Sequence, residues 1–138
     1  LVFLSASCPC SKSHANHLNQ LNRRYSKLKV FGVITDRYEG QKRIEQYYTS
    51  DRFGFPLVKD PSQSLVKKYN ALKTPHVVLL QKDPSGHYQK LYEGGVTDRR
   101  QFARSEKKYL SENLASLKRG NPIPYEKGRS LGCYIRRF

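Results

Sequence analysis

Two cysteines that flank a proline are the residues of this chain best suited to chemistry. Cys8, Pro9 and Cys10 follow the apolar run at residues 1–4. Proline is favoured at the first position of a helix because it has no N–H group to leave unpaired, so Pro9 predicts a helix start with Cys8 at or beside the N-cap. The unpaired amides and the positive end of the helix dipole favour a thiolate there. We therefore expect Cys8 to have a lowered pKa and to act as a nucleophile.

The apolar pattern predicts the elements that hold this turn. Residues 1–4 are too short a run for a helix of their own and predict a buried strand. Apolar side chains recur at near-helical spacing over residues 15–25 and predict a helix with one apolar face. The β-branched run at residues 29–35 predicts a second strand. Strand, helix and strand then form a parallel, right-handed crossover.

This order of strand, cysteine turn and helix resembles the thioredoxin superfamily, whose active-site cysteine lies at the same turn. The resemblance covers nearly the whole chain. The usual Cys-x-x-Cys is missing, because the residue three after Cys8 is Ser11 and the second cysteine is Cys10. A Gly-Cys-Tyr-Ile sequence at residues 132–135 is the other marker. The two motifs together resemble a subgroup of redoxin-like, AhpC/TSA-related bacterial proteins that carry a Cys-Pro-Cys turn and a terminal Gly-Cys-x-Ile.

The resemblance implies an α/β, thioredoxin-like fold with a four-stranded mixed central sheet and helices on both faces. We expect the strands in the order 29–35, 1–5, 77–80 and 88–93, with only the last pair antiparallel. Helices are expected at residues 41–50 and 62–69, and a long last helix should run from a cap at Asp98 to Gly120. We expect residues 1–120 to form the domain, without its N-terminal segment, and residues 121–138 to form an irregular tail packed back on it.

Thr74 and Pro75 open an apolar strand, at a point where a proline cannot serve an interior ladder position. The resemblance implies that this Thr-Pro peptide bond is cis and that Pro75 packs beside the cysteine turn. It also implies that the backbone of Thr74 binds an extended substrate peptide. From the residues alone, Pro75 would be read as a turn.

The histidines are candidate ligands or bases. His14 and His17 are expected to be solvated surface residues of the first helix. His76, directly after Pro75, either supports a thiolate or joins a soft-metal site with Cys8 and Cys10. That metal site is an alternative, and the main expectation is no metal and no cofactor.

Cys133 is the expected partner of the cysteine turn. A disulfide between Cys8 and Cys10 needs a Cα separation of about 4.4–6.8 Å. With only Pro9 between the two cysteines, and Pro9 starting a helix, this separation is hard to reach without strain. A tail broken by proline and glycine needs an anchor, and the subgroup resemblance pairs the two motifs. Whether Cys133 bonds Cys8 or Cys10 stays open, as does the alternative of a permanent structural disulfide with an inert third cysteine.

Composition narrows the class of protein. The 138 residues suffice for one domain with a real core, and no apolar run approaches the ~20 residues of a membrane span. The net charge of +15 comes from 26 Lys and Arg against 11 Asp and Glu, spread along every segment, so we expect no specific nucleic-acid site. We expect a monomer in the bacterial periplasm or cell envelope, with any targeting segment outside this sequence.

The expected function is a thiol–disulfide oxidoreductase with Cys8, Cys10 and Cys133 as catalytic residues. It would act on a protein or small-molecule disulfide or thiol through a mixed disulfide, with Thr74 and Pro75 in the binding site. One alternative is a peroxiredoxin-like, antioxidant thiol peroxidase, because residues 5–8 resemble the Ser/Thr-x-x-Cys of those enzymes, although their upstream proline and activating arginine are not matched. The other is a copper-binding chaperone of the same fold.

Overall fold

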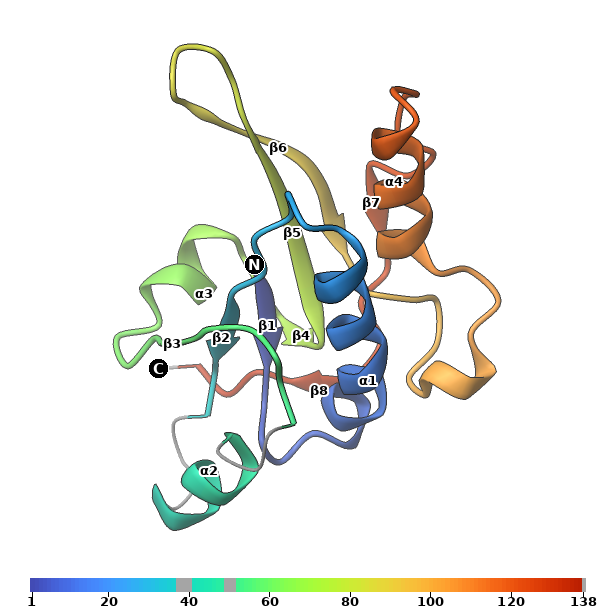
Figure 1. Ribbon diagram of the computed structural model, residues 1–138. Helices are drawn as coiled ribbons and strands as arrows, with labels where there is room; N and C mark the ends of the chain where they lie inside the picture. Colours follow the sequence, from blue (N-terminus) through green and yellow to red (C-terminus); the bar gives the residue numbers. More distant parts are fainter. Residues whose placement is uncertain (37–40, 49–51, 138) are drawn as a thin grey trace.

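The computed structural model describes residues 1–36, 41–48 and 52–137 (Figure 1). The described strands are β1 (Val2–Leu4), β2 (Gly32–Ile34), β3 (Leu57–Lys59), β4 (Lys73–Thr74), β5 (His76–Lys82), β6 (Tyr88–Gly94), β7 (Lys127–Gly128) and β8 (Cys133–Tyr134). The described helices are α1 (Pro9–Arg24), α2 (Gln41–Tyr48), α3 (Ser64–Lys68), the 3₁₀ turn η1 (Phe102–Arg104) and α4 (Tyr109–Lys118). None of these helices is long and apolar enough to cross a bilayer.

The strands form a mixed six-stranded sheet in the order β3-β2-β1-β5-β6-β7, and β4 and β8 pair separately. The inner order β2-β1-β5-β6 confirms the order predicted from the sequence. Strand β1 is therefore central, as the cysteine turn requires. The expected number of four strands is wrong, because β3 and β7 extend the two edges. They have only three and two residues, too few to show the alternation that predicts a strand.

The expectation that only the last strand pair is antiparallel is also wrong. β1 and β5 are antiparallel, with Val2 opposite Val77 and Phe3 opposite His76. Between β3 and β5 the chain forms only the five-residue helix α3 and the two-residue strand β4, and it does not cross back to the opposite end of the strands. The chain thus enters β5 beside the C-terminal end of β1. This entry point also brings Thr74 next to the cysteine turn.

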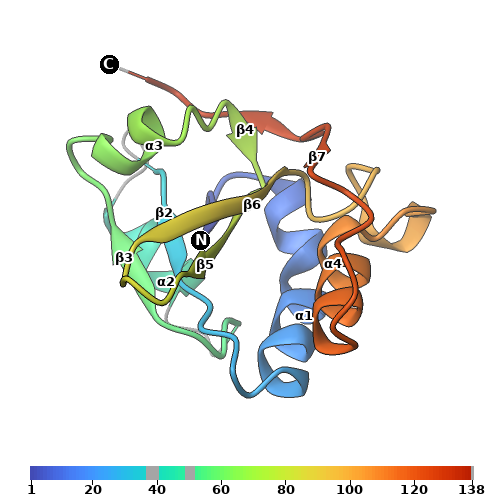
Figure 2. The ribbon, with the colours of Figure 1, turned by 90° about the horizontal axis from the view of Figure 1, so that it is seen from above.

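Helices cover both faces of the sheet, as predicted. Figure 2 shows α1 and α4 together on one side and α3 on the other. On the first side, Leu18 of α1 and Leu114 of α4 pack with sheet residues such as Tyr92, which is fully buried. On the second side, Val66 of α3 packs with buried sheet residues and with Ile135 of the C-terminal segment. The cores on the two faces hold β1 between two apolar layers.

The last helix is shorter than predicted. Asp98 does not begin it: its carboxylate accepts the N–H of Glu106 at 2.9 Å, and its own N–H donates to the carbonyl of Lys107 at 3.0 Å. These bonds close a loop, which contains η1, before α4 starts at Tyr109. An aspartate that binds loop amides is unavailable as a helix cap.

The C-terminal segment is tied to the rest of the chain by backbone pairing. β7 is parallel to β6, and β8 is antiparallel to β4. The N–H of Ile135 donates to the carbonyl of Leu72 at 2.8 Å, and the Arg137 guanidinium donates to the carbonyl of Ala71 at 2.6 Å. The side chain of Gln63 donates to the carbonyl of Arg136 at 2.6 Å. These contacts carry Cys133 across the end of β1.

Candidate active site

The turn between β1 and α1 is held by a carboxylate that the sequence analysis did not identify. Asp36 accepts the hydroxyl hydrogen of Ser5 at 2.7 Å and the N–H of Ala6 at 2.8 Å. The hydroxyl of Tyr48 donates to the same carboxylate at 2.9 Å. The position of Asp36 could have indicated this role. Asp36 comes two residues after β2, and because β2 is parallel to β1, both strands end on the same side of the sheet as the cysteine turn.

Cys8 lies at the N-cap of α1, where Pro9 begins the helix as predicted. The residue is 1% exposed. Its thiol donates a hydrogen bond to the carbonyl of Thr74 at 3.3 Å. The apolar burial of β1 and the start of the helix thus place one sulfur at the positive end of α1.

Several contacts favour the thiolate of Cys8. Burial alone would raise the pKa of this thiol. Hydrogen bonds to the sulfur, chiefly from the side chains of Cys133 and Thr74, outweigh burial, and the pKa of Cys8 is lowered from that of an ordinary thiol. The predicted direction of the shift is confirmed. A lowered pKa is a property that a nucleophilic thiol needs.

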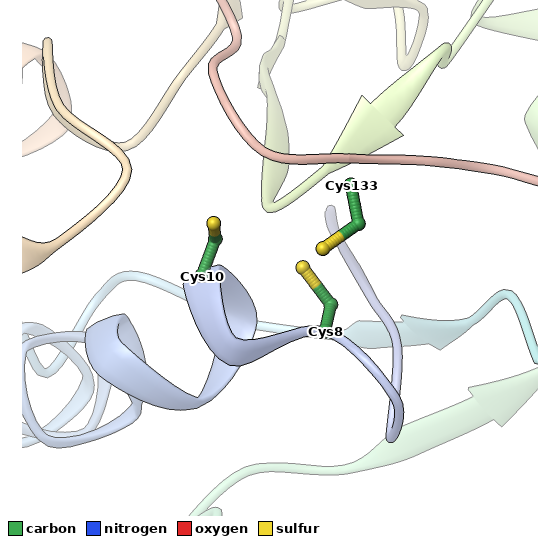
Figure 3. Close-up of side chains that lie close together, drawn as sticks. All are labelled: Cys8, Cys10 and Cys133. Carbon is green, nitrogen blue, oxygen red and sulfur yellow. The ribbon is translucent and has the colours of Figure 1, made fainter.

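Cys133 reaches the turn from the C-terminal segment. It stands opposite Thr74 in the β4–β8 pair. A Cβ atom on Gly132 would overlap the carbonyl oxygen of Thr74, so this close approach requires glycine. The sulfurs of Cys8, Cys10 and Cys133 all lie within 4.8 Å of one another, and all three are free thiols. In Figure 3 the side chains of Cys8 and Cys133 point toward one another, and that of Cys10 stands to one side of them on the first turn of α1.

The other two thiols are held protonated. Burial raises the pKa of Cys133 to about 12, and its hydrogen bond to Cys8 and repulsion from the Cys8 thiolate act in the same direction. Burial likewise raises the pKa of Cys10, and the charge of Cys8 adds to the effect. One thiolate beside two thiols is the state that three sulfurs at this spacing favour.

The peptide bond between Thr74 and Pro75 lies at the cysteines, because its carbonyl oxygen accepts the hydrogen bond from Cys8. This peptide bond is cis, as predicted. The hydroxyl of Thr74 is buried, and the Cys8 sulfur is the one acceptor it has among the described residues. Strand β8 pairs with the backbone of β4 at Thr74. The superfamily resemblance assigned this backbone to the binding of an extended substrate peptide. The chain's own tail therefore lies where such a peptide was expected.

The expectation that His14 and His17 are solvated is wrong. They are 1% and 7% exposed. His14 bonds through Nδ1 to the carbonyl of Cys10 and through Nε2 to the hydroxyl of Thr97, both at 2.8 Å. His17 stacks on Phe102 with ring centroids 4.5 Å apart. Both histidines lie on the buried face of α1 and hold the loop that contains Thr97 and Phe102. The sequence of the helix alone does not show that this loop covers them.

His76 does not join the cysteines. Its Nδ1 is 2.7 Å from the hydroxyl of Ser130, and its ring packs on Phe3. Among the described residues, the group spaced to hold a metal ion is Cys8, Cys10 and Cys133. The alternative metal site predicted from the sequence therefore had the wrong third residue. His76 belongs to β5, where it stands opposite Phe3 of β1, and it does not extend toward the cysteine turn.

The central strand, its cysteine at a helix N-terminus and the cis-proline facing that cysteine define a thioredoxin-like fold. Within this class, the model of the AhpC/TSA family matches residues 1–103 of the 138, and the chain belongs to that family. No curated protein matches the sequence.

Solved structures share the fold at low identity. An uncharacterized conserved protein from Geobacillus kaustophilus has a TM-score of 0.83 at 21% identity, over 99% of this chain and 75% of that one. A hypothetical protein from Sinorhizobium meliloti 1021 has a TM-score of 0.80 at 23% identity, over 99% and 78%. A secreted disulfide oxidoreductase of Mycobacterium tuberculosis, described as homologous to Escherichia coli DsbE, has a TM-score of 0.52 at 16% identity, over 64% and 63%.

Proposed function

We propose that the protein is a thiol–disulfide oxidoreductase in which Cys8 is the nucleophile and Cys133 the resolving thiol. The observation that carries this proposal is the meeting of Cys8 and Cys133 at the start of α1. Cys8 attacks a substrate disulfide to give a mixed disulfide, and Cys133 then attacks Cys8 and releases the substrate. The family and the disulfide oxidoreductase among the structural neighbours support this class of chemistry.

The pKa values order the two steps. While Cys8 is a thiolate, burial and its negative charge keep the Cys133 thiol protonated. A mixed disulfide at Cys8 removes that charge and the hydrogen bond with it. The pKa of Cys133 then falls, and its thiolate becomes available to attack the neighbouring sulfur. Cys133 thus becomes reactive only after Cys8 has reacted.

Access to Cys8 requires a movement. The Cys8 residue is 1% exposed, and the Cys133 side chain lies on it. The pairing that holds Cys133 is a strand of two residues. So short a strand opens at low cost compared with the elements of the central sheet. We propose that substrate enters when the Cys133 side chain, or β8 itself, moves aside.

The test is a single turnover with the neutral disulfide of 2-mercaptoethanol. We expect the free thiols per chain to fall from three to one, with two equivalents of 2-mercaptoethanol released. A redox titration should place the potential of the bond above about −300 mV. A lower potential would identify the bond as a permanent structural disulfide. Consumption of peroxide without reaction with disulfides would assign the site to peroxidase chemistry.

A second candidate function, soft-metal binding, is favoured by the spacing of the three sulfurs. Thiolates select copper(I) and zinc. Three sulfurs at about 2.3 Å from one ion lie about 4 Å apart in a trigonal site, close to the spacing of Cys8, Cys10 and Cys133. Copper(I) titration against a competing chelator tests it, and Cys10→Ser should weaken metal binding far more than disulfide exchange.

We also propose an oxidising compartment, the cell envelope, as the site of action. The support is the secreted mycobacterial neighbour and the dithiol site. Finding the protein in the cytoplasmic fraction, with its thiols reduced, would contradict this.

A further inference from the structure

Arginines line a hollow next to the C-terminal segment that leads to Cys133. Its volume is about 360 Å³. Its lining consists of Arg99, Arg100, Gln101, Arg104 and Leu131. Leu131 stands two residues before Cys133, so the hollow borders the segment that carries the resolving thiol. We call these five residues the arginine hollow.

The loop that supplies the arginines is fixed to the first turns of α1. The N–H of Phe102 donates to the hydroxyl of Ser13 at 2.6 Å, and the Phe102 ring stacks on His17. The hydroxyl of Thr97 is 2.8 Å from Nε2 of His14. Figure 1 shows this loop beside the end of α1 where the cysteine turn lies. The loop that lines the arginine hollow is therefore attached to the same helix that carries Cys10.

Acidic side chains neutralise only part of the positive charge around the hollow. Arg99 pairs with Asp98 at 3.1 Å and with Glu106 at 3.4 Å. Arg100 and Arg104 are exposed and have no acidic partner in the described part of the chain. Arg100 is also close enough to Cys10 for its charge to oppose the rise that burial causes in the pKa of that thiol.

The tail decides what size of substrate fits. An extended peptide would have to displace β8 from Thr74, together with the buried side chain of Ile135. A small disulfide needs only a change in the Cys133 side chain. The hollow, at about 360 Å³, is within the range of roughly 300–1,000 Å³ typical of small-molecule sites.

We propose that the arginine hollow binds the carboxylates of a small anionic disulfide and presents its sulfur–sulfur bond to the cysteines. The inference rests on the proposed dithiol function. Arg100 and Arg104 hold the carboxylates through charge-assisted hydrogen bonds. Because the three sulfurs lie within 4.8 Å of one another, a disulfide placed beside Cys10 is also next to Cys8.

The reaction balances without a further reagent. The Cys8 thiolate attacks one sulfur of the disulfide RSSR, forms Cys8–S–S–R and releases RS⁻. Cys133 then attacks the Cys8 sulfur, forms the Cys8–Cys133 disulfide and releases the second RS⁻. Two electrons pass from the two protein sulfurs to the substrate. The proton of the Cys133 thiol converts one RS⁻ to RSH, and the other RS⁻ takes a proton from water.

The experiment compares single-turnover rates of the whole chain with three disulfides of different charge. These are glutathione disulfide (anionic), the disulfide of 2-mercaptoethanol (neutral) and cystamine (cationic), each normalised to its rate with free dithiothreitol. For the double variant Arg100→Gln, Arg104→Gln we expect about a tenfold loss with glutathione disulfide. The change with the neutral disulfide should stay below about twofold. The charge reversal Arg100→Glu, Arg104→Glu should shift the preference to cystamine.

The control separates the hollow from the general charge of +15. Arg23 and Arg24 are exposed at the far end of α1, about 20 Å along the helix from Cys10. Their double change to Gln removes the same charge and should leave the anionic preference intact. Equal losses in both double variants, or none in the hollow variant, would overturn the inference. Failure of the wild type with the neutral disulfide would instead reject the dithiol function.

Discussion

Thr74 pairs with Cys133 across the β4–β8 ladder, and its carbonyl also accepts the thiol hydrogen of Cys8 at 3.3 Å. One residue therefore contacts both thiols that we assign to catalysis. Its buried hydroxyl has no other partner among the described residues and favours the Cys8 thiolate. The tail strand thus occupies the edge that the superfamily resemblance assigned to a substrate peptide, and Cys133 lies beside Cys8 there.

Gly132→Ala should separate these two roles of the tail. The new Cβ would overlap the Thr74 carbonyl, so β8 must leave β4. We expect Cys8 to be alkylated several-fold faster, because it loses its cover, and the intramolecular disulfide to form at least tenfold more slowly. Gly54→Ala is the matched control, since its Cβ would meet only a side-chain atom of Asn19 at 3.7 Å. Equal effects of the two changes would contradict the role of β8.

Cys133→Ser should arrest the reaction at the mixed disulfide. Without the resolving thiol, substrate added to Cys8 is not released, and mass spectrometry should find one stable adduct on the peptide with Cys8. Cys8→Ser should give no such adduct. In Cys10→Ser we expect release to proceed within a few-fold of wild type. Rapid release from Cys133→Ser, with Cys10 joined to Cys8, would assign the resolving role to Cys10.

Asp36→Asn should weaken both the turn and the reactivity of Cys8. The change removes a charged acceptor from the N–H of Ala6 and the hydroxyl of Ser5. Hydrogen bonds to charged groups contribute about 1.5–3 kcal/mol, so the unfolding free energy should fall by roughly that amount. Tyr48→Phe removes one bond to the carboxylate and leaves the turn contacts, so it should cost less. Urea unfolding and the alkylation rate of Cys8 measure the two effects.

His17 should make stability depend on pH. Burial lowers its pKa to about 4, from about 6.5 in the unfolded chain. The unfolded state therefore binds the proton first, and stability is fully present above about pH 6.5 and declines as the pH falls toward 4. His17→Phe keeps the stacking on Phe102 and should flatten this part of the profile. An unchanged slope between pH 7 and 4 would rule out His17 as its source.

The cysteine turn could be predicted because its signals are local. Proline at the first helical position and an apolar strand before it determine where the Cys8 sulfur lies. The position of Cys133 was also within reach, since a tail with little apolar content needs an anchor and Gly132 permits close approach. The sequence left open whether Cys8 or Cys10 is its partner, and our proposal of Cys8 rests on the side-chain directions in Figure 3.

The remaining features depend on contacts far apart in the sequence. Asp36 acts on residues about 30 positions earlier, and His14 meets Thr97 across 83 positions, so neither shows a local pattern. The direction of β5 depends on the path of the chain between β3 and β5, which the composition of β5 does not reveal. That direction was nevertheless implied by another expectation: Pro75 precedes β5 and Cys8 follows β1, so they can meet only if these strands are antiparallel.

The most direct test of the central claim is to map the disulfide in protein oxidised by one equivalent of a neutral disulfide. Peptides digested without reduction, after free thiols are blocked at low pH, identify the bonded pair by mass. We predict Cys8 joined to Cys133, with Cys10 recovered as the blocked free thiol. A dominant Cys8–Cys10 or Cys10–Cys133 bond would contradict the assignment of Cys8 as nucleophile and Cys133 as its resolving thiol.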